Sequence, residues 1–86
     1  MDEIQKLRKK IDKVDDLLVA VLAKRVDLVK RIQLIKKQKH IPPVDQKRKL
    51  EIIKRAVKKG EKKGLKPAVV KKVFTAIHDT LQFILE

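Results

Sequence analysis

Hydrophobic residues recur along the first half of the chain at alternating spacings of three and four positions. They fall at Ile4, Leu7, Ile11, Val14, Leu18 and Val21, and again at Leu28, Ile32 and Ile35. This spacing is the heptad pattern of a helix that packs lengthwise against another helix. A second apolar flank widens the stripe beyond what a two-stranded coiled coil buries, at Leu17, Leu22 and Val29. The pattern predicts one long helix over about residues 2–39.

Proline and glycine divide the rest of the chain into two shorter helical stretches. Pro42 and Pro43 stop the first helix, because proline lacks an amide donor and disfavours helical geometry in the residue before it. Asp45 predicts the N-cap of a second helix that fades at Gly60, and Pro67 marks the first turn of a third. No segment alternates with a period of two for long enough to indicate a sheet. The predicted fold class is all-α, with one long and two shorter helices.

The two shorter helices each present an apolar face toward a core. Those faces consist of Leu50, Ile53 and Val57, backed by Ile52 and Ala56, and of Val70, Val73, Phe74, Ile77, Leu81 and Ile84. Each shorter helix spans only about half the length of the first, so one chain cannot cover the whole long seam. A chain of 86 residues also buries a small share of its surface. We therefore expect a single domain over residues 1–86 that forms an intertwined homodimer with the long helices paired.

The charge balance points to anionic surroundings without naming the anion. The chain carries 24 Lys and Arg against 11 Asp and Glu, a formal net charge of +13. A substrate, a nucleic acid and simple counterions all fit this excess, and lysine-rich surfaces are also common in thermophiles. Cysteine is absent, and neither His40 nor His78 has a partner at ligand spacing, so we expect no metal site. No apolar run reaches signal-peptide or membrane-span length, so we expect a cytoplasmic protein that binds no membrane.

Arg25 interrupts the apolar seam of the first helix. A buried guanidinium there is costly unless an anion or a carboxylate compensates it. Lys36 returns to nearly the same face three turns later, so the two cations can grip opposite ends of a small anion. Arg8 lies roughly a quarter-circle away at about 100° per residue, so the pocket it serves is more easily that of a partner chain. The alternative for Arg25 is a side chain that reaches the surface or pairs with an acid.

Asp45 and Arg48 stand in the first turn of the second helix, where free N–H groups and the helix dipole favour negative charge. The alternative for Asp45 is an ordinary cap, and for Arg48 a solvated surface arginine. No nucleophile–base pair and no glycine-rich phosphate loop is evident. An enzyme with this sequence would therefore work by holding its substrate and by charge, with no covalent step.

Several motifs resemble the all-helical, AroQ-type chorismate mutases. The run from Leu7 to Asp15, Leu17-Leu18, and Leu22 to Arg25 resemble that family's opening helix. Further matching positions, which extend the resemblance over essentially the whole chain, are Lys36, Pro42, Asp45, Arg48, Gly64-Leu65, Phe74 and Ile77.

The resemblance implies a dimer of three-helix chains whose active sites are each built from both subunits. It implies conversion of chorismate to prephenate without a cofactor, the branch step of the shikimate pathway toward phenylalanine and tyrosine. By resemblance, Arg25 and Arg48 would contact the substrate from one chain and Arg8 from the other, Lys36 would lie beside the ether oxygen, and Asp45 would hold the ring hydroxyl. A pericyclic rearrangement would then proceed by conformer selection and by stabilisation of negative charge on the ether oxygen.

Three positions depart from the family pattern. Lys49 stands where the family usually has Glu, Leu81 where it has Ser or Asn, and Leu85 where it has the Gln or Glu that donates to the ether oxygen. Gln82 and Glu86 each lie one residue away, about 100° around the helix. The apolar spacing of Leu81 and Leu85 favours core positions for both.

Two other functions stay open. The departures favour a mutase-like ligand-binding or regulatory domain with little or no activity. The other function is that of a basic helical nucleic-acid-binding protein using residues 54–72, where Glu61 is the only acid among nine Lys or Arg. Two Phe and no Tyr or Trp leave few stacking platforms, and the basic residues are spread over several faces, so the sequence argues against nucleic acid.

Overall fold

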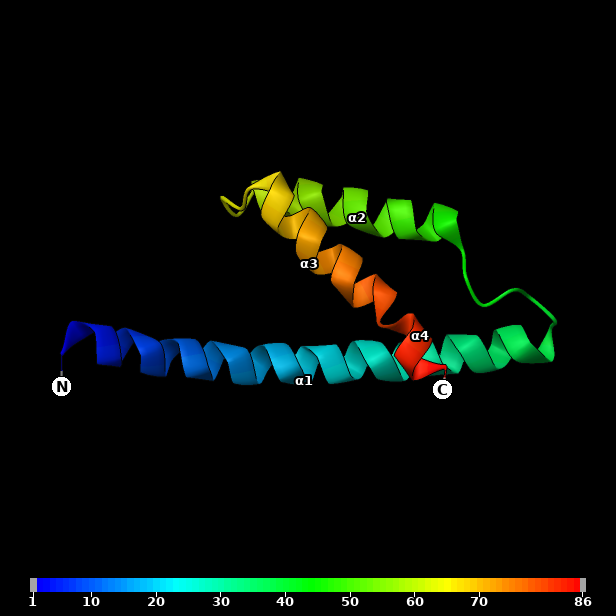
Figure 1. Cartoon of the computed structure of the whole chain (residues 1–86), viewed down its shortest axis with the longest axis horizontal. Coiled ribbons are helices and arrows are strands. Elements are labelled where there is room, and N and C mark those ends of the chain that lie inside the picture. The colour runs from blue at the N-terminus through cyan, green and yellow to red at the C-terminus, as the bar shows by residue number, and fades with distance from the viewer. Residues whose placement is uncertain (1, 86) are drawn as a thin grey trace. The chain divides into compact units, whose positions relative to one another are not determined.

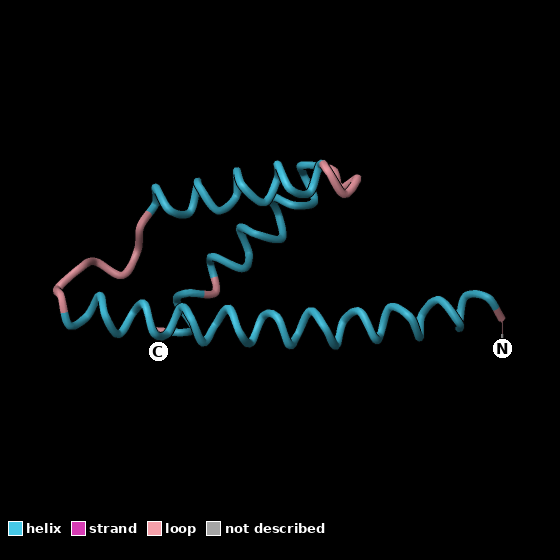
Figure 2. The backbone as a smooth tube through the Cα atoms, turned by 180° about the vertical axis from the view of Figure 1, so that it is seen from behind, coloured by secondary structure: helices cyan, strands magenta, loops and turns pink. Residues whose placement is uncertain are grey.

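The backbone of residues 2–85, described by a computed structural model, is built from helices (Figures 1 and 2). They are α1 (Glu3–Gln38), α2 (Gln46–Glu61), α3 (Pro67–Asp79) and the four-residue α4 (Leu81–Ile84). No strand occurs over residues 2–85, which confirms the all-α prediction and the three helices expected from the sequence. The chain divides into two compact units, one ending at Ile35 and the other beginning at Lys36.

The first unit consists of α1 up to Ile35, and its apolar seam is uncovered. Asp2 begins the helix by accepting a hydrogen bond from the backbone N–H of Gln5 on its Oδ1, at 2.8 Å. No described residue of α1 is buried. The exposed large hydrophobic residues of the helix range from 41% exposed for Leu22 to 68% for Val19, while Val26 and Val29 are half-buried. A helix that leaves an apolar stripe this wide in water needs a further surface against which to pack.

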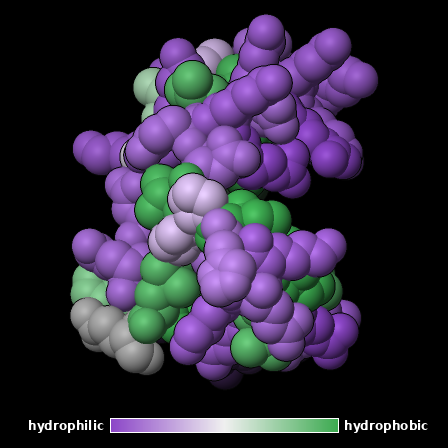
Figure 3. Space-filling model, turned by 90° about the vertical axis from the view of Figure 1, so that its right-hand side faces the viewer, coloured by the Kyte–Doolittle hydropathy of each residue, from purple (hydrophilic) through white to green (hydrophobic). Residues whose placement is uncertain are grey.

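The second unit is held together by the packing of α2 on α3. The predicted inner face of α2 is half-buried at Ile52, Ile53, Ala56 and Val57, while hydrophilic side chains gather over its outer side (top of Figure 3). Val70 of α3 is 4% exposed, and among residues 2–85 it is the one hydrophobic residue that is buried. Leu50 and Val73, both predicted to face the core, are instead 68% and 49% exposed.

Gly60 lets the two helices approach closely. This glycine is buried, and a Cβ built on it would lie 2.7 Å from Cγ2 of Val70. Real Cβ atoms essentially never come this close to another atom, so a side chain at this position would force Val70 or the helices to shift. The glycine that the sequence marks as the end of the helix is thus also the point of closest packing.

Both α1 and α2 end in Schellman turns. After α2, Gly64 has φ of 78°, its N–H donates to the Glu61 carbonyl at 3.1 Å, and the N–H of Leu65 donates to the Gly60 carbonyl at 2.9 Å. After α1 the same turn places His40 at φ of 57°, with the N–H of Ile41 donating to the Lys36 carbonyl at 2.8 Å. Glycine adopts this left-handed conformation without strain, whereas histidine does not.

Thr80 interrupts the last helix, contrary to the continuous helix through Ile84 that the apolar pattern predicts. Its hydroxyl donates to the Ile77 carbonyl at 2.6 Å, and its N–H is shared between the carbonyls of Ala76 and Ile77. A threonine that bonds to the preceding turn competes with the regular helical ladder. Consequently α4 begins at Leu81 as a separate short turn.

Adding a methyl group at Gly60 tests the close crossing. Alanine favours an isolated helix over glycine by about 1 kcal/mol, whereas overpacking against Val70 costs roughly 1–3 kcal/mol. We expect Gly60→Ala to lower the free energy of unfolding in urea, measured at fixed protein concentration. In a Val70→Ala background, where the overlapping methyl is gone, the same change should be neutral or stabilising. A stabilising effect in the native background would contradict the packing described.

At the strained end of α1, by contrast with Gly60, a substitution should stabilise the fold. Replacing His40 with glycine relieves a left-handed residue, and we expect Tm to rise by an amount equivalent to about 0.5–1 kcal/mol. Lys39→Gly is the matched control, since Lys39 has no positive φ to relieve. It should lower Tm, and equal effects of the two substitutions in thermal unfolding would argue against a strained His40.

Candidate functional site

The five predicted site residues are distributed over both units. Arg8 and Arg25 belong to the first, where Arg8 is exposed and Arg25 is half-buried. Within residues 2–85, Arg25 forms no ion pair with a carboxylate. Over these residues the acid-paired alternative for Arg25 is therefore not seen.

Lys36 is held against the loop that precedes α2. Its Nζ donates a hydrogen bond to the Pro43 carbonyl at 3.3 Å, and its side chain is half-buried. The rings of Pro42 and Pro43 restrict φ in the backbone that carries this acceptor. The hydrogen bond therefore holds the ammonium of Lys36 next to the loop that leads into α2.

Asp45 and Arg48 both have partners within the chain. Oδ1 of Asp45 accepts from the backbone N–H of Arg48 at 3.1 Å, so the predicted N-cap is confirmed. The guanidinium of Arg48 lies 3.5 Å from Oε2 of Glu51, in a pair with side chains 59% and 52% exposed. A pair this exposed contributes little to stability, so separating Arg48 from Glu51 costs little.

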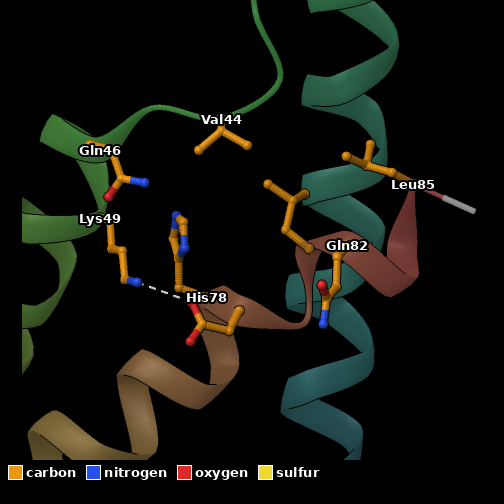
Figure 4. A pocket seen from close by; sticks show the side chains of 8 residues that line it. Val44, Gln46, Lys49, His78, Gln82 and Leu85 are labelled. Carbon is orange, nitrogen blue, oxygen red and sulfur yellow. Dashed lines mark hydrogen bonds and ion pairs between the residues drawn. The ribbon is translucent and has the colours of Figure 1, made fainter.

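A pocket of about 380 Å³ lies within the second unit, between the start of α2 and the α3–α4 junction (Figure 4). The residues that line it are Val44, Gln46, Lys49, His78, Asp79, Leu81, Gln82 and Leu85. All three positions that depart from the family pattern, 49, 81 and 85, thus line one cavity. The sequence marks them one at a time, whereas the structure brings them together.

Leu81 and Leu85 do not occupy the core positions that their spacing favours. Leu81 is half-buried and Leu85 is 46% exposed, and both line the pocket. The break at Thr80 detaches them from the apolar face of α3, which is why the periodicity misleads. Gln82 of the same short turn also lines the pocket, whereas Glu86 lies outside the described residues.

Lys49 is paired with Asp79, a residue that the sequence analysis did not single out. Its Nζ lies 3.0 Å from Oδ1 of Asp79, and the side chains are 24% and 56% exposed (dashed line in Figure 4). One sequence signal does point to such a partner. Lys47, Arg48 and Lys49 follow one another in the first turn of α2, which holds no acid, at the end of the helix dipole that repels cations.

The described chain contains no ready site for a metal ion. Over residues 2–85, no group of three or more His, Cys, Asp or Glu side chains is placed to hold one. His78 lines the pocket and His40 lies at the end of α1, each in a different setting. None of the helices over these residues is both long and apolar enough to cross a membrane.

Comparison with known proteins gives one match. A search of curated proteins and a search of solved structures each found none. The model of the family described as chorismate mutase type II matches residues 7–81. The match runs from the first heptad of α1 to the first residue of α4 and includes all five predicted site positions. The chain therefore belongs to the type II, all-helical chorismate mutase family.

Proposed function

We propose that this chain is a chorismate mutase that rearranges chorismate to prephenate. The observation that carries the proposal is Arg25, a half-buried cation in an apolar seam with no carboxylate partner over residues 2–85. A guanidinium in such surroundings favours a bound anion, because leaving it uncompensated is costly. Chorismate, the substrate of the family, carries two carboxylates.

In the proposed mechanism the chain provides no acid, base or nucleophile. Arg25 and Arg48 bind the substrate carboxylates from one chain and Arg8 from the other, which selects the folded conformer in which the reacting carbons are close. Lys36 donates to the ether oxygen as negative charge grows there, and Asp45 accepts from the ring hydroxyl. These charges act more strongly where water is excluded than on an open surface.

The proposed active form is a homodimer with the long helices paired. Its support is the apolar seam of α1, where Ile4, Leu7, Ile11, Val14, Leu18, Val21, Leu28, Ile32 and Ile35 are each 50% or more exposed in the single chain. A second copy offers the same seam, so a two-fold interface is self-complementary. Such pairing also accounts for Arg8, which reaches a partner's pocket more easily than its own. We propose further that residues 1–86 act as one domain, and that the protein acts in the cytoplasm.

Removing the Arg25 guanidinium tests the mutase activity. We expect Arg25→Ala to lower kcat/KM for chorismate by at least about 10²–10³, since one preorganised charge contact is lost. The measurement is the decrease of chorismate absorbance in the ultraviolet. Arg31→Ala is the matched control, because Arg31 is 71% exposed and pairs with Asp27 on the same helix. It should keep activity within a few-fold, and equal losses in the two variants would contradict the assignment.

Placing a charge in the apolar seam of α1 tests the proposed dimer. We expect Leu18→Glu, which buries a charge between the paired helices, to weaken dimerisation by at least about 100-fold. Lys9→Glu places the same side chain on the opposite side of α1, nine residues and about 180° from Leu18, and should leave the dimer intact. Analytical ultracentrifugation over a concentration series measures both. A wild-type chain that stays monomeric at high concentration would overturn the dimer.

The second candidate is a mutase-like domain that binds the ligand but turns it over poorly. It is favoured by Leu81 and Leu85, which line the pocket and have no hydrogen to donate. Chorismate binding by calorimetry without turnover at high protein concentration would select it. The nucleic-acid alternative has one supporting observation, the nine exposed cations within residues 54–72. Salt-sensitive binding to DNA or RNA that survives excess chorismate would select that instead.

A further inference from the structure

The Lys49–Asp79 pair is unequally embedded in the pocket. Lys49 keeps 24% of its side chain exposed and Asp79 keeps 56%, although their charged atoms lie 3.0 Å apart. Lys49 is the one Lys or Arg among the residues that line the pocket. Figure 4 shows its amine at the edge of the cavity, with the His78 ring and the Gln46 side chain nearby.

Separating the ion pair therefore costs Lys49 and Asp79 different amounts of free energy. Asp79 is largely hydrated, so its carboxylate can turn fully into water at small cost. Lys49 is mostly enclosed, and without an anion its ammonium would be partly desolvated and unpaired. An anionic group that enters the pocket can take the place of Asp79 on Lys49, while Asp79 has no comparable need of Lys49.

We propose that Lys49 is a substrate-binding cation and that Asp79 is its resting partner, displaced when a carboxylate of the substrate enters the pocket. The inference rests on the proposed function, which supplies a dicarboxylate substrate. It assigns a use to a residue that replaces the Glu usual in the family. Lys49 lies about 100° around α2 from Arg48, and neither Arg48 nor Lys36 is among the residues that line the pocket, so Lys49 would be the cation that this pocket offers to a substrate carboxylate.

If Asp79 competes with the substrate for Lys49, substitutions of the two residues should change substrate affinity in opposite directions. If Asp79 holds Lys49 in the free protein, the apparent affinity for substrate is reduced by the fraction of time that the pair is closed. Removing Asp79 then improves substrate binding, whereas removing Lys49 weakens it. A purely structural clamp between α2 and α3 predicts instead that both substitutions are harmful or neutral.

The experiment is steady-state kinetics of chorismate consumption by the full chain with Asp79→Asn, Lys49→Met and both. We expect Asp79→Asn to lower KM about fivefold, the factor that matches an ion pair of ~1 kcal/mol. Lys49→Met should raise KM about tenfold, as loss of a charge-assisted contact does. The double variant should resemble Lys49→Met alone, because Asp79 acts only through Lys49. A KM that is unchanged or raised in Asp79→Asn would overturn the proposal.

Asp27→Asn is the matched control for overall charge. It breaks the Arg31–Asp27 pair, which also has a distance of 3.0 Å, and it changes the net charge by the same amount in the first unit. We expect its KM to stay at the wild-type value. An equal drop in KM would mean that added positive charge alone draws in the substrate, and the proposal would fail.

Failure of the proposed function is distinguishable from failure of this inference. If the wild-type chain turns over chorismate but Asp79→Asn does not lower KM, only the inference about Lys49 and Asp79 is contradicted. If wild type shows no turnover, calorimetric titration with chorismate replaces KM by Kd, and the same opposite signs are expected for the two substitutions. Absence of both turnover and binding in a folded protein would overturn both proposals.

Discussion

The uncovered apolar seam of α1 is the constraint on which the remaining structure depends. Apolar surface contributes roughly 25 cal/mol per Å² when it leaves water, so a helix with no fully buried residue leaves much of that stabilisation unrealised in the single chain. The second unit has a small core of its own, centred on Val70 and Gly60. The gain available from covering α1 therefore favours association over a solitary chain, and the proposed dimer is its simplest form.

Arg25 links the proposed dimerisation to anion binding, because it lies within the seam that the dimer would cover. Covering the seam removes water from the guanidinium, which strengthens its attraction to an anion and raises the cost of leaving it without one. Stability and binding are then linked: an anion held by Arg25 stabilises the associated state. One arginine in a hydrophobic heptad thus connects the assembly of the fold with its proposed activity.

Local sequence rules predicted the elements well and the long-range contacts poorly. The Pro42-Pro43 stop, the Asp45 cap and Pro67 fixed the helix bounds closely, because each acts on backbone next to itself. The Lys49–Asp79 pair joins residues thirty positions apart, and the tight place at Gly60 depends on Val70 of another helix. The break at Thr80 was missed because one hydroxyl overrides an apolar period that continues past it.

Because Leu81 and Leu85 cannot donate a hydrogen bond, the proposed mechanism depends more on Lys36. Where the family usually has a second donor to the ether oxygen, this chain has leucine, so in the proposed mechanism the ammonium of Lys36 is the donor that the resemblance leaves in place. Its position is set by the Pro43 carbonyl, 3.3 Å from Nζ. The Pro42-Pro43 loop then matters twice, because it stops α1 and also provides the carbonyl that accepts from Lys36, the proposed donor to the ether oxygen. A donor that works alone depends more on preorganisation than one of a pair, since no second contact corrects its misplacement.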